Sequence, residues 1–281
     1  MQIGDFHVEQ LSEGFFELFE DGSFSKMDPS RLKDPEGDSA LGKYSSALGI
    51  DPLLIRRNQT NIIVDPGLGW GLDKNSRYHN TSNVITNLDI FGLKREDISM
   101  VLLSHLHFDH VAGATFVSKD SKTTPTFPNA EYLVHRDEWE FALQQIGKEQ
   151  EHPGAGYNLD EFYKLVAEKR IRFIEKEVSE PVPGLTFIKT GGHTAGHMAV
   201  KLKSTNAAAY YLGDLIPTEY HLNHYPMKFI DYDSIQAKKA KMLLLKQAFK
   251  EQATMFFYHS LYKKSGKLIQ DKHKKYVLID P

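Results

Sequence analysis

SHLHFDHVAGATF, at residues 104–116, is the stretch of this chain that says most about its fold. It directly follows the apolar run 98–103, which is typical of a buried strand. Within six positions it carries four potential metal ligands, namely His105, His107, Asp109 and His110. A surface strand end rich in histidine by chance would look similar, but so many ligands in one hexapeptide disfavour that interpretation. The stretch therefore predicts a metal site at the edge of a sheet in an α/β protein.

The spacing within the cluster predicts two groups of ligands. In an extended segment alternate side chains point the same way, so His105 and His107 can bind one ion together. Asp109 and His110 come after the strand end, where the chain can turn toward Gly113 and present them to a second ion. Imidazole nitrogens and carboxylate oxygens suit zinc, and also manganese or iron.

Composition disfavours several classes of protein. The 281 residues include 34 basic and 37 acidic side chains, a formal net charge of −3, so we expect no nucleic-acid partner. The absence of cysteine excludes disulfides and leaves His, Asp and Glu to hold any metal. Neither a signal peptide nor an apolar span of membrane length is recognisable, so we expect a cytoplasmic protein without membrane contact. The Lys-rich stretches 263–267 and 272–275 are interpreted as solvated faces.

The rest of the chain alternates between expected strands and helices, which indicates one layered α/β domain over residues 1–281. Strands are expected at 6–10, 14–20, 53–57, 61–64, 100–103, 130–135, 171–174, 186–190 and 207–212, and in the apolar run before His259. Helices are expected at 82–93 with Ser82 as the N-cap, at 136–143 and at 159–169. The segment 181–185 is expected to be a turn.

Residues 21–50 interrupt this alternation. DGS, DPS and DPEGD punctuate a segment with few periodic apolar positions. A loop of that length inside a compact domain is uncommon and often functional, so we interpret it as an N-terminal arm, a flap or a dimer contact. A disordered insertion explains the same composition equally well.

Three later positions repeat the pattern of a strand followed by a metal-binding side chain. In GGHTAGH, at 191–197, glycines flank His193 and leave room for a metal to approach. Asp214 follows the next strand and could bridge two cations with its two oxygens, and His259 follows the last apolar strand. We expect His197 to hydrogen-bond its own loop rather than to bind metal.

One earlier strand also ends in an acidic residue. The turn DPGLG at 65–69 leaves Asp65 at a strand end, and the glycines let the chain turn sharply away. Turn formation alone explains the glycines. Asp65 has a second possible use as a carboxylate that orients a metal-bound histidine.

The order of these residues resembles the metallo-β-lactamase superfamily with its HxHxDH signature. The resemblance rests on HLHFDH at 105–110, on the later His193, Asp214 and His259, and on the early aspartate turn at 65–69. It covers roughly residues 52–260. It implies a four-layer αββα sandwich with a dinuclear site at one edge. In the family the residue after the last histidine is often acidic, whereas here it is Ser260.

The resemblance also implies how the ligands are shared between two divalent ions, with zinc expected first and manganese or iron as alternatives. The ligands divide into two groups of three with a bridging carboxylate: His105, His107 and His193 on the first metal, Asp109, His110 and His259 on the second, and Asp214 on both. Two adjacent cations lower the pKa of a bridging water, so that hydroxide can attack a carbonyl or phosphoryl group that the same ions polarise. Asp109 can orient this water and pass a proton to the leaving group. The reaction class is metal-assisted hydrolysis.

Within the superfamily, the segment 213–221 and the arm at 21–50 resemble quorum-quenching lactonases and their methyl-parathion-hydrolase-like relatives. This branch opens the lactone ring of N-acyl-homoserine lactones and commonly forms dimers, so a small-molecule substrate and a homodimer are expected. Some members carry a tyrosine three residues after the bridging aspartate, where this chain has Pro217. The candidate substrate-binding residues in its place are Tyr220, His221 and His224.

Other functions are left open by the sequence: a different esterase, a thioesterase, a phosphotriesterase or a non-catalytic metal-binding protein. A glyoxalase II-like thioesterase would carry a basic helical C-terminal domain, and only a short tail follows His259. An RNA-processing nuclease would show a large insertion and a basic surface. A flavo-diiron protein would replace one histidine by a carboxylate. All seven ligands are present, which favours an enzyme.

Overall fold

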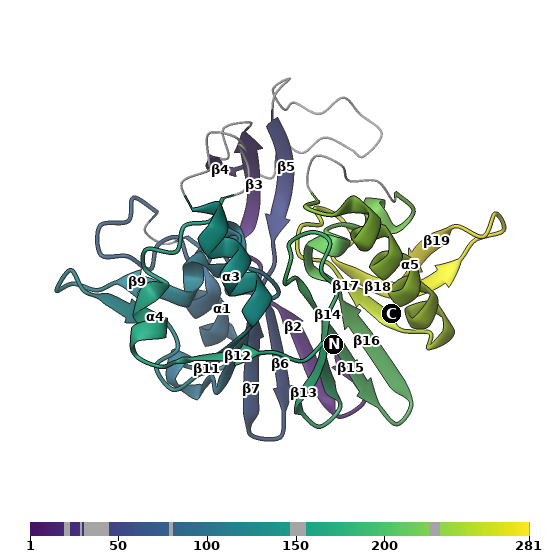
Figure 1. Ribbon diagram of the computed structural model, residues 1–281, viewed down its shortest axis with the longest axis horizontal. Coiled ribbons are helices and arrows are strands. Elements are labelled where there is room, and N and C mark those ends of the chain that lie inside the picture. Colours follow the sequence, from purple (N-terminus) through teal and green to yellow (C-terminus); the bar gives the residue numbers. More distant parts are fainter. Residues whose placement is uncertain are drawn as a thin grey trace.

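Two seven-stranded sheets lie face to face at the centre of the protein, and helices cover the outer face of each (Figure 1). The structure is a computed structural model that describes residues 1–19, 23–28, 30, 45–78, 81–146, 156–224 and 231–280. The four layers run from helices through two sheets to a helix, which confirms the predicted αββα sandwich.

The first sheet combines an antiparallel half and a parallel half. Its order is β1 (Gln2–Ile3), β2 (Phe6–Gln10), β6 (Leu53–Arg57), β7 (Thr60–Val64), β8 (Met100–Leu102), β11 (Glu131–His135) and β12 (Ile171–Ile174). From β7 to β12 neighbouring strands are parallel. The carboxyl ends of these strands therefore share one edge of the sheet, where loops can gather functional side chains.

The second sheet is mostly antiparallel. Its order is β13 (Val178–Val182), β14 (Leu185–Lys189), β15 (Met198–Ser204), β16 (Ala207–Tyr211), β17 (Thr254–Phe256), β18 (Ser265–Gln270) and β19 (Tyr276–Ile279). Only β16 and β17 pair in parallel. Because β14 and β16 both pair antiparallel with β15, the carboxyl ends of β14, β16 and β17 also lie at one edge.

The helices occupy the two outer layers and the loops between strands. They are α1 (Val84–Ile90), α2 (Phe108–Val111), α3 (Arg136–Gln145), α4 (Tyr163–Ala167) and α5 (Ser234–Lys250), with short 3-10 helices η2 (Arg95–Asp97), η3 (Ala112–Ala114), η4 (Gly213–Leu215) and η5 (Glu219–Leu222). In the described part of the chain, no helix is both long and apolar enough to cross a membrane.

Some predicted boundaries were wrong. Asn83, not Ser82, caps α1, because its side chain accepts from the backbone N–H groups of Ile85 and Thr86. The helix expected over 159–169 is reduced to α4, and the turn expected at 181–185 is shorter because β13 extends to Val182. Helix α5 was not predicted.

The segment 21–50, which was predicted to be an arm, contains one strand near each of its ends. β3 (Gly14–Phe19) pairs with β4 (Phe24–Met27) on one side and with β5 (Ser45–Ile50) on the other. Figure 1 shows this small sheet at the top of the view, between the halves of the sandwich. A flap or dimer contact was predicted for residues 21–50, and the middle of that segment, residues 31–44, lies outside the described residues.

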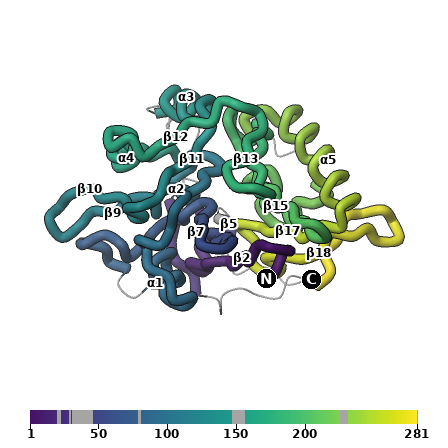
Figure 2. The backbone as a smooth tube through the Cα atoms, turned by 90° about the horizontal axis from the view of Figure 1, so that it is seen from below, coloured from purple at the N-terminus to yellow at the C-terminus, as the bar shows by residue number. Residues whose placement is uncertain are grey.

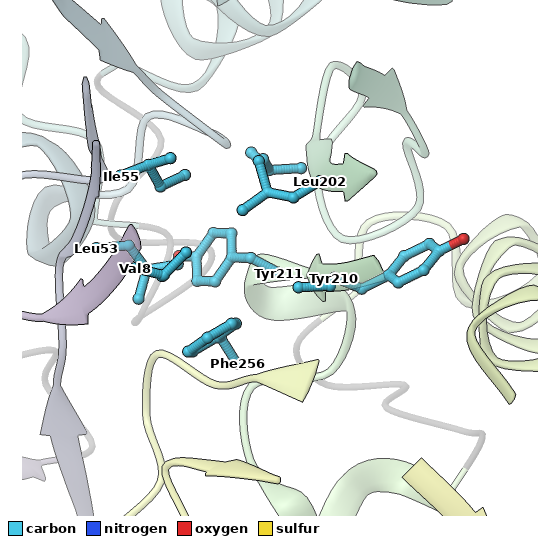
Figure 3. Close-up of a pocket in the computed structure, with 9 residues that line it drawn as sticks. Val8, Leu53, Ile55, Leu202, Tyr210, Tyr211 and Phe256 are labelled. Carbon is cyan, nitrogen blue, oxygen red and sulfur yellow. The ribbon is translucent and has the colours of Figure 1, made fainter. Parts of the chain in front are cut away.

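The interior between the sheets is closely packed. Figure 3 shows the ring of Tyr211 pointing between Val8, Leu53 and Phe256, whereas the next residue along the strand, Tyr210, points the opposite way. Successive side chains of a strand point to opposite faces of the sheet. The Tyr211 ring therefore lies in the central core and the Tyr210 ring lies under α5. The cavity there has about 10 Å³, barely room for one water.

Two hairpins extend the molecule on opposite sides. β9 (Thr115–Val117) pairs with β10 (Thr123–Pro125), and β18 pairs with β19. Figure 2 shows them at opposite ends of the view from below.

Candidate metal centre

Five strands end at the same place, and each is followed by a buried polar side chain of the predicted site. The residues are Asp65 after β7, His105 after β8, His193 after β14, Asp214 after β16 and His259 after β17. The residues come from both sheets, so the centre lies at the shared edge of the sandwich. The structure brings all seven predicted ligands together there, in two groups.

The first cluster consists of His105, His107, His193 and one oxygen of Asp214. Nδ1 of His107 lies 2.9 Å from Nε2 of His105 and 3.2 Å from Nε2 of His193. Oδ2 of Asp214 lies 3.5 Å from Nε2 of His193 and 4.0 Å from Nε2 of His105. Ligands of a tetrahedral zinc ion at its usual bond lengths lie about 3.3 Å from one another. The spacing of these four atoms therefore fits one metal ion.

The second cluster consists of Asp109, His110 and His259. Nε2 of His110 lies 3.2 Å from Nε2 of His259. Oδ2 of Asp109 lies 3.4 Å from Nε2 of His259 and 3.8 Å from Nε2 of His110. The carboxylate and the two imidazoles thus converge on one point, as the ligands of a second ion would.

Asp214 lies between the two clusters. While Oδ2 faces the first cluster, Oδ1 lies 3.3 Å from Nε2 of His110 and 3.3 Å from Nε2 of His259 in the second. The residue belongs to η4, directly after β16, and is 9% exposed. A carboxylate that offers one oxygen to each of two ligand groups is suited to bridge two cations.

The charges differ between the clusters. Burial, together with the neighbouring histidines, lowers the pKa of His105 and of His107 well below the usual value, so both are neutral at pH 7. Burial also opposes protonation of His110 and His259, but Asp214 and Asp109 outweigh it and raise the pKa of both histidines. Metal ligands must be deprotonated, so metal binding at the second cluster would release protons.

Asp65 supports the second cluster from behind. It is fully buried, and one of its oxygens lies 3.0 Å from Nδ1 of His110. The same carboxylate accepts from the backbone and hydroxyl of Ser104, at 2.7 and 2.6 Å, and from the hydroxyl of Tyr211 at 2.5 Å. Its φ of 49° places it in the left-handed region, which a turn with this many hydrogen bonds can sustain. The predicted role of Asp65 in orienting a histidine agrees with this geometry.

Two further groups lie against ring nitrogens of the ligand histidines, and neither of them was predicted. Nδ1 of His193 lies 3.4 Å from Oδ1 of Asp231. Nδ1 of His259 lies 2.8 Å from the backbone oxygen of Gly49 in β5. A hydrogen-bonding partner such as the Gly49 oxygen fixes the ring orientation of a metal-bound histidine. Neither contact has a local sequence signal, because both join segments that are far apart in the chain.

His197 lies in the same loop as His193 but outside both clusters. Its Nδ1 lies 2.6 Å from the hydroxyl of Thr190, at the other end of the loop. This confirms the prediction that His197 hydrogen-bonds its own loop.

The three candidate substrate residues lie in or beside η5, in different surroundings. His221 is half-buried, its Nδ1 lies 2.7 Å from the hydroxyl of Thr218, and burial together with the charge of Lys241 lowers its pKa to about 4. Tyr220 is 51% exposed and lines an open surface cavity of about 280 Å³ to which no predicted ligand contributes. His224 is exposed, with Nδ1 2.6 Å from the backbone oxygen of Tyr220. The charges of Asp214 and His259 also act on the pKa of His221.

Ser260, at the position where the family often has an acidic residue, fixes η5 in place. Its hydroxyl donates to the carboxylate of Glu219 at 2.6 Å and accepts from the Glu219 backbone at 3.2 Å. The segment that carries His221 is thereby tied to the segment that carries His259. An acidic side chain is thus present beside Ser260, supplied by η5.

Known proteins resemble this chain in sequence. An N-acyl homoserine lactonase of Bacillus cereus is 26% identical over 187 residues, which are 65% of this chain and 64% of that protein. The N-acyl homoserine lactonase AttM of Agrobacterium fabrum is 24% identical over 193 residues, 61% of each chain. These matches span less than two thirds of the length of the relatives.

Solved structures resemble the chain over its whole length. A probable metal-dependent hydrolase of Staphylococcus aureus has 26% identity and a TM-score of 0.75, covering 100% of this chain and 99% of that one. AidC, a dizinc quorum-quenching lactonase, has 21% identity and a TM-score of 0.72, covering 100% and 96%. The sequence model of one family matches residues 47–259, most of the chain and all seven predicted ligands. With this match and the fold in agreement, the chain belongs to the metallo-β-lactamase superfamily.

Proposed function

We propose that this chain is a hydrolase that uses two divalent metal ions to cleave an ester bond, and that its substrate is an N-acyl-homoserine lactone. The observation that carries the reaction class is the position of Asp214, which offers one oxygen to each of two ligand clusters. Two ions held there, with zinc expected first and manganese or iron as alternatives, would supply a water nucleophile at neutral pH and would polarise the substrate carbonyl.

The side chains of the centre have distinct parts in this proposal. His105 and His107 are neutral at pH 7, the form in which imidazole binds metal. The Asp109 side chain is 14% exposed, so one of the predicted ligands remains in reach of solvent and substrate. Its backbone oxygen accepts from the hydroxyl of Tyr258 at 2.8 Å, which fixes the residue in α2. Asp109 is thus placed to take a proton from the attacking water and deliver it to the alcohol that leaves as the ring opens.

His221 is the best-placed candidate for contact with the lactone. With a pKa of about 4 it is neutral at pH 7, and its Nδ1 is engaged with Thr218. A neutral imidazole in this position can hydrogen-bond a substrate oxygen through its other ring nitrogen without adding charge beside two cations. Tyr220 and His224 stay in the proposal as more exposed contacts from the same segment.

The substrate class is supported by the relatives that match in sequence, which are named N-acyl homoserine lactonases. It is also supported by AidC, whose structure holds the product N-hexanoyl-L-homoserine. We include a homodimer in the proposal, as in the lactonase branch that the sequence resembles. Sedimentation of the metal-loaded chain measures the oligomeric state, and a monomer would contradict that part alone.

A substrate panel tests the proposal. The metal-loaded protein is assayed with homoserine lactones of several acyl lengths, a thioester, a phosphotriester and a β-lactam. We expect lactone opening to have the highest kcat/KM, to stop on chelation and to return with zinc, cobalt or manganese. Hydrolysis of only the other compounds would overturn the proposed substrate class but not the proposed reaction class. No hydrolysis of any of them would overturn both.

A further inference from the structure

Glu138 is a buried acidic residue that takes no part in either ligand cluster. It lies in the first turn of α3 and is fully buried. We infer that Glu138 is a positioning residue that sets the geometry of the first cluster by holding together the two loops that supply its histidines. The inference rests on the proposed function, because it concerns the first of the two proposed metal sites.

The carboxylate of Glu138 accepts hydrogen bonds from both loops. Oε1 accepts from the backbone N–H of Leu106, the residue between His105 and His107, at 2.9 Å. Oε2 accepts from the hydroxyl of Thr194, the residue after His193, and from the backbone N–H of Gly196 at 3.1 Å. One side chain thus spans the backbone segments of all three histidines of the first cluster.

A further contact joins Glu138 to a ligand ring. The hydroxyl of Tyr157 donates to Oε1 at 3.4 Å, and the ring of Tyr157 packs edge-on against that of His107, with 4.9 Å between centroids. The loop also lies directly on α3, because a Cβ on Gly196 would come within 2.1 Å of the Glu138 backbone nitrogen. A side chain at position 196 would push the loop away from the helix.

The hydrogen-bond donors suit a carboxylate better than an amide. Four donors reach two oxygens, and an ionised carboxylate is acceptor-only. Burial raises the pKa of Glu138, and the hydrogen bonds from Thr194, Leu106 and Gly196 oppose that rise. In Glu138→Gln an NH2 group replaces one of the two oxygens, and this group cannot accept hydrogen bonds from the donors on that side. The amide would therefore hold only one of the two loops.

The second cluster is supported by other groups. His110 is held by Asp65, and His259 is held by the backbone oxygen of Gly49. Loss of the Glu138 carboxylate should therefore weaken the first metal site and spare the second. A general loss of stability would not discriminate between the sites in this way.

The experiment measures zinc affinity of each cluster separately in the full chain. His259→Ala disables the second cluster and leaves the first, and His107→Ala does the reverse. We expect Glu138→Gln to weaken zinc binding about tenfold in the His259→Ala protein and to change it less than about twofold in the His107→Ala protein. Thr194→Val, which removes a single donor, should act in the same direction with a smaller effect.

Glu13→Gln is the matched control. Glu13 is a second buried glutamate that accepts from two backbone N–H groups, those of Leu68 at 2.8 Å and Gly69 at 3.1 Å, but it does not contact the loops of the first cluster. The Glu13→Gln variant should have a lower unfolding midpoint than wild type and an unchanged zinc affinity of the first cluster.

The inference is overturned if Glu138→Gln leaves the first cluster unchanged, weakens both clusters equally, or has the same effect there as Glu13→Gln. Zinc binding is measured without substrate, so failure to hydrolyse lactones would leave the inference standing. If neither His259→Ala nor His107→Ala bound zinc, the proposed metal centre would fail and the inference with it.

Discussion

Nδ1 of His110 lies 3.0 Å from the carboxylate of Asp65, and both side chains are fully buried. The contact fixes the ring so that Nε2 faces His259 and Asp214. We predict that Asp65→Asn lowers the metal affinity of the second cluster by about 10- to 100-fold, because the amide cannot accept all the bonds that the carboxylate does. Competitive metal titration measures this. Tyr211→Phe, which removes one donor to Asp65, should have a smaller effect, and wild-type affinity in Asp65→Asn would contradict the assigned role.

Asp109 is the residue that transfers the proton in the proposed mechanism. Asn at this position keeps the size of the side chain but cannot accept a proton, and it binds metal less well. We predict that Asp109→Asn lowers kcat about 10³-fold with the circular dichroism spectrum unchanged. His107→Ala should have a comparable effect by removing a ligand of the first cluster. Full turnover in either variant would rule out the mechanism.

His221 should make the metal-free protein sensitive to acid. Its pKa is about 4 in the folded protein, against an ordinary value of 6.5, so the unfolded chain takes up this proton first as the pH falls. The corresponding stability is present above about pH 6.5 and is lost as the pH falls toward 4. Urea unfolding at pH 7 and pH 4.5 should therefore show a smaller loss of stability in His221→Gln than in wild type. An equal loss in both proteins would show that His221 is not buried as described.

Gly49 should not tolerate a side chain. A Cβ there would come within 2.7 Å of the Ser260 backbone oxygen, and the Gly49 oxygen lies 2.8 Å from Nδ1 of His259. We predict that Gly49→Ala costs about 1–3 kcal/mol of stability by overpacking and also weakens the second cluster. Gly156→Ala is the control, because a Cβ at Gly156 meets only Phe108, at an ordinary 3.8 Å. Equal unfolding free energies for the two variants would contradict this.

The ligands could be predicted from sequence because each is encoded locally. An apolar strand pattern followed at once by His105, His193 or His259 places the side chain at a strand end, whatever the rest of the fold. Parallel strands end at the same edge of a sheet, so the position of these side chains at one shared edge follows from strand direction. The ligands are therefore more predictable than the residues around them. The N-cap of α1 was misplaced by one residue, from Asn83 to Ser82, because both side chains can cap a helix.

The remaining features depend on contacts that local patterns do not show. Helix α5 has five lysines among 17 residues and leaves Met242 and Leu243 exposed, so its apolar residues do not mark one face clearly. The contact of Gly49 with His259 joins positions 210 residues apart. The segment around Gly49 was predicted to be part of an arm because its strand β5 is preceded by a long stretch of turn residues.

The most direct test of the account is a zinc titration of the metal-free protein with the rate of N-hexanoyl-homoserine lactone opening as the readout. We expect no opening without metal and a rate that rises to a plateau at two zinc ions per chain. A plateau at one ion per chain, opening without metal, or no opening at any zinc concentration would contradict it.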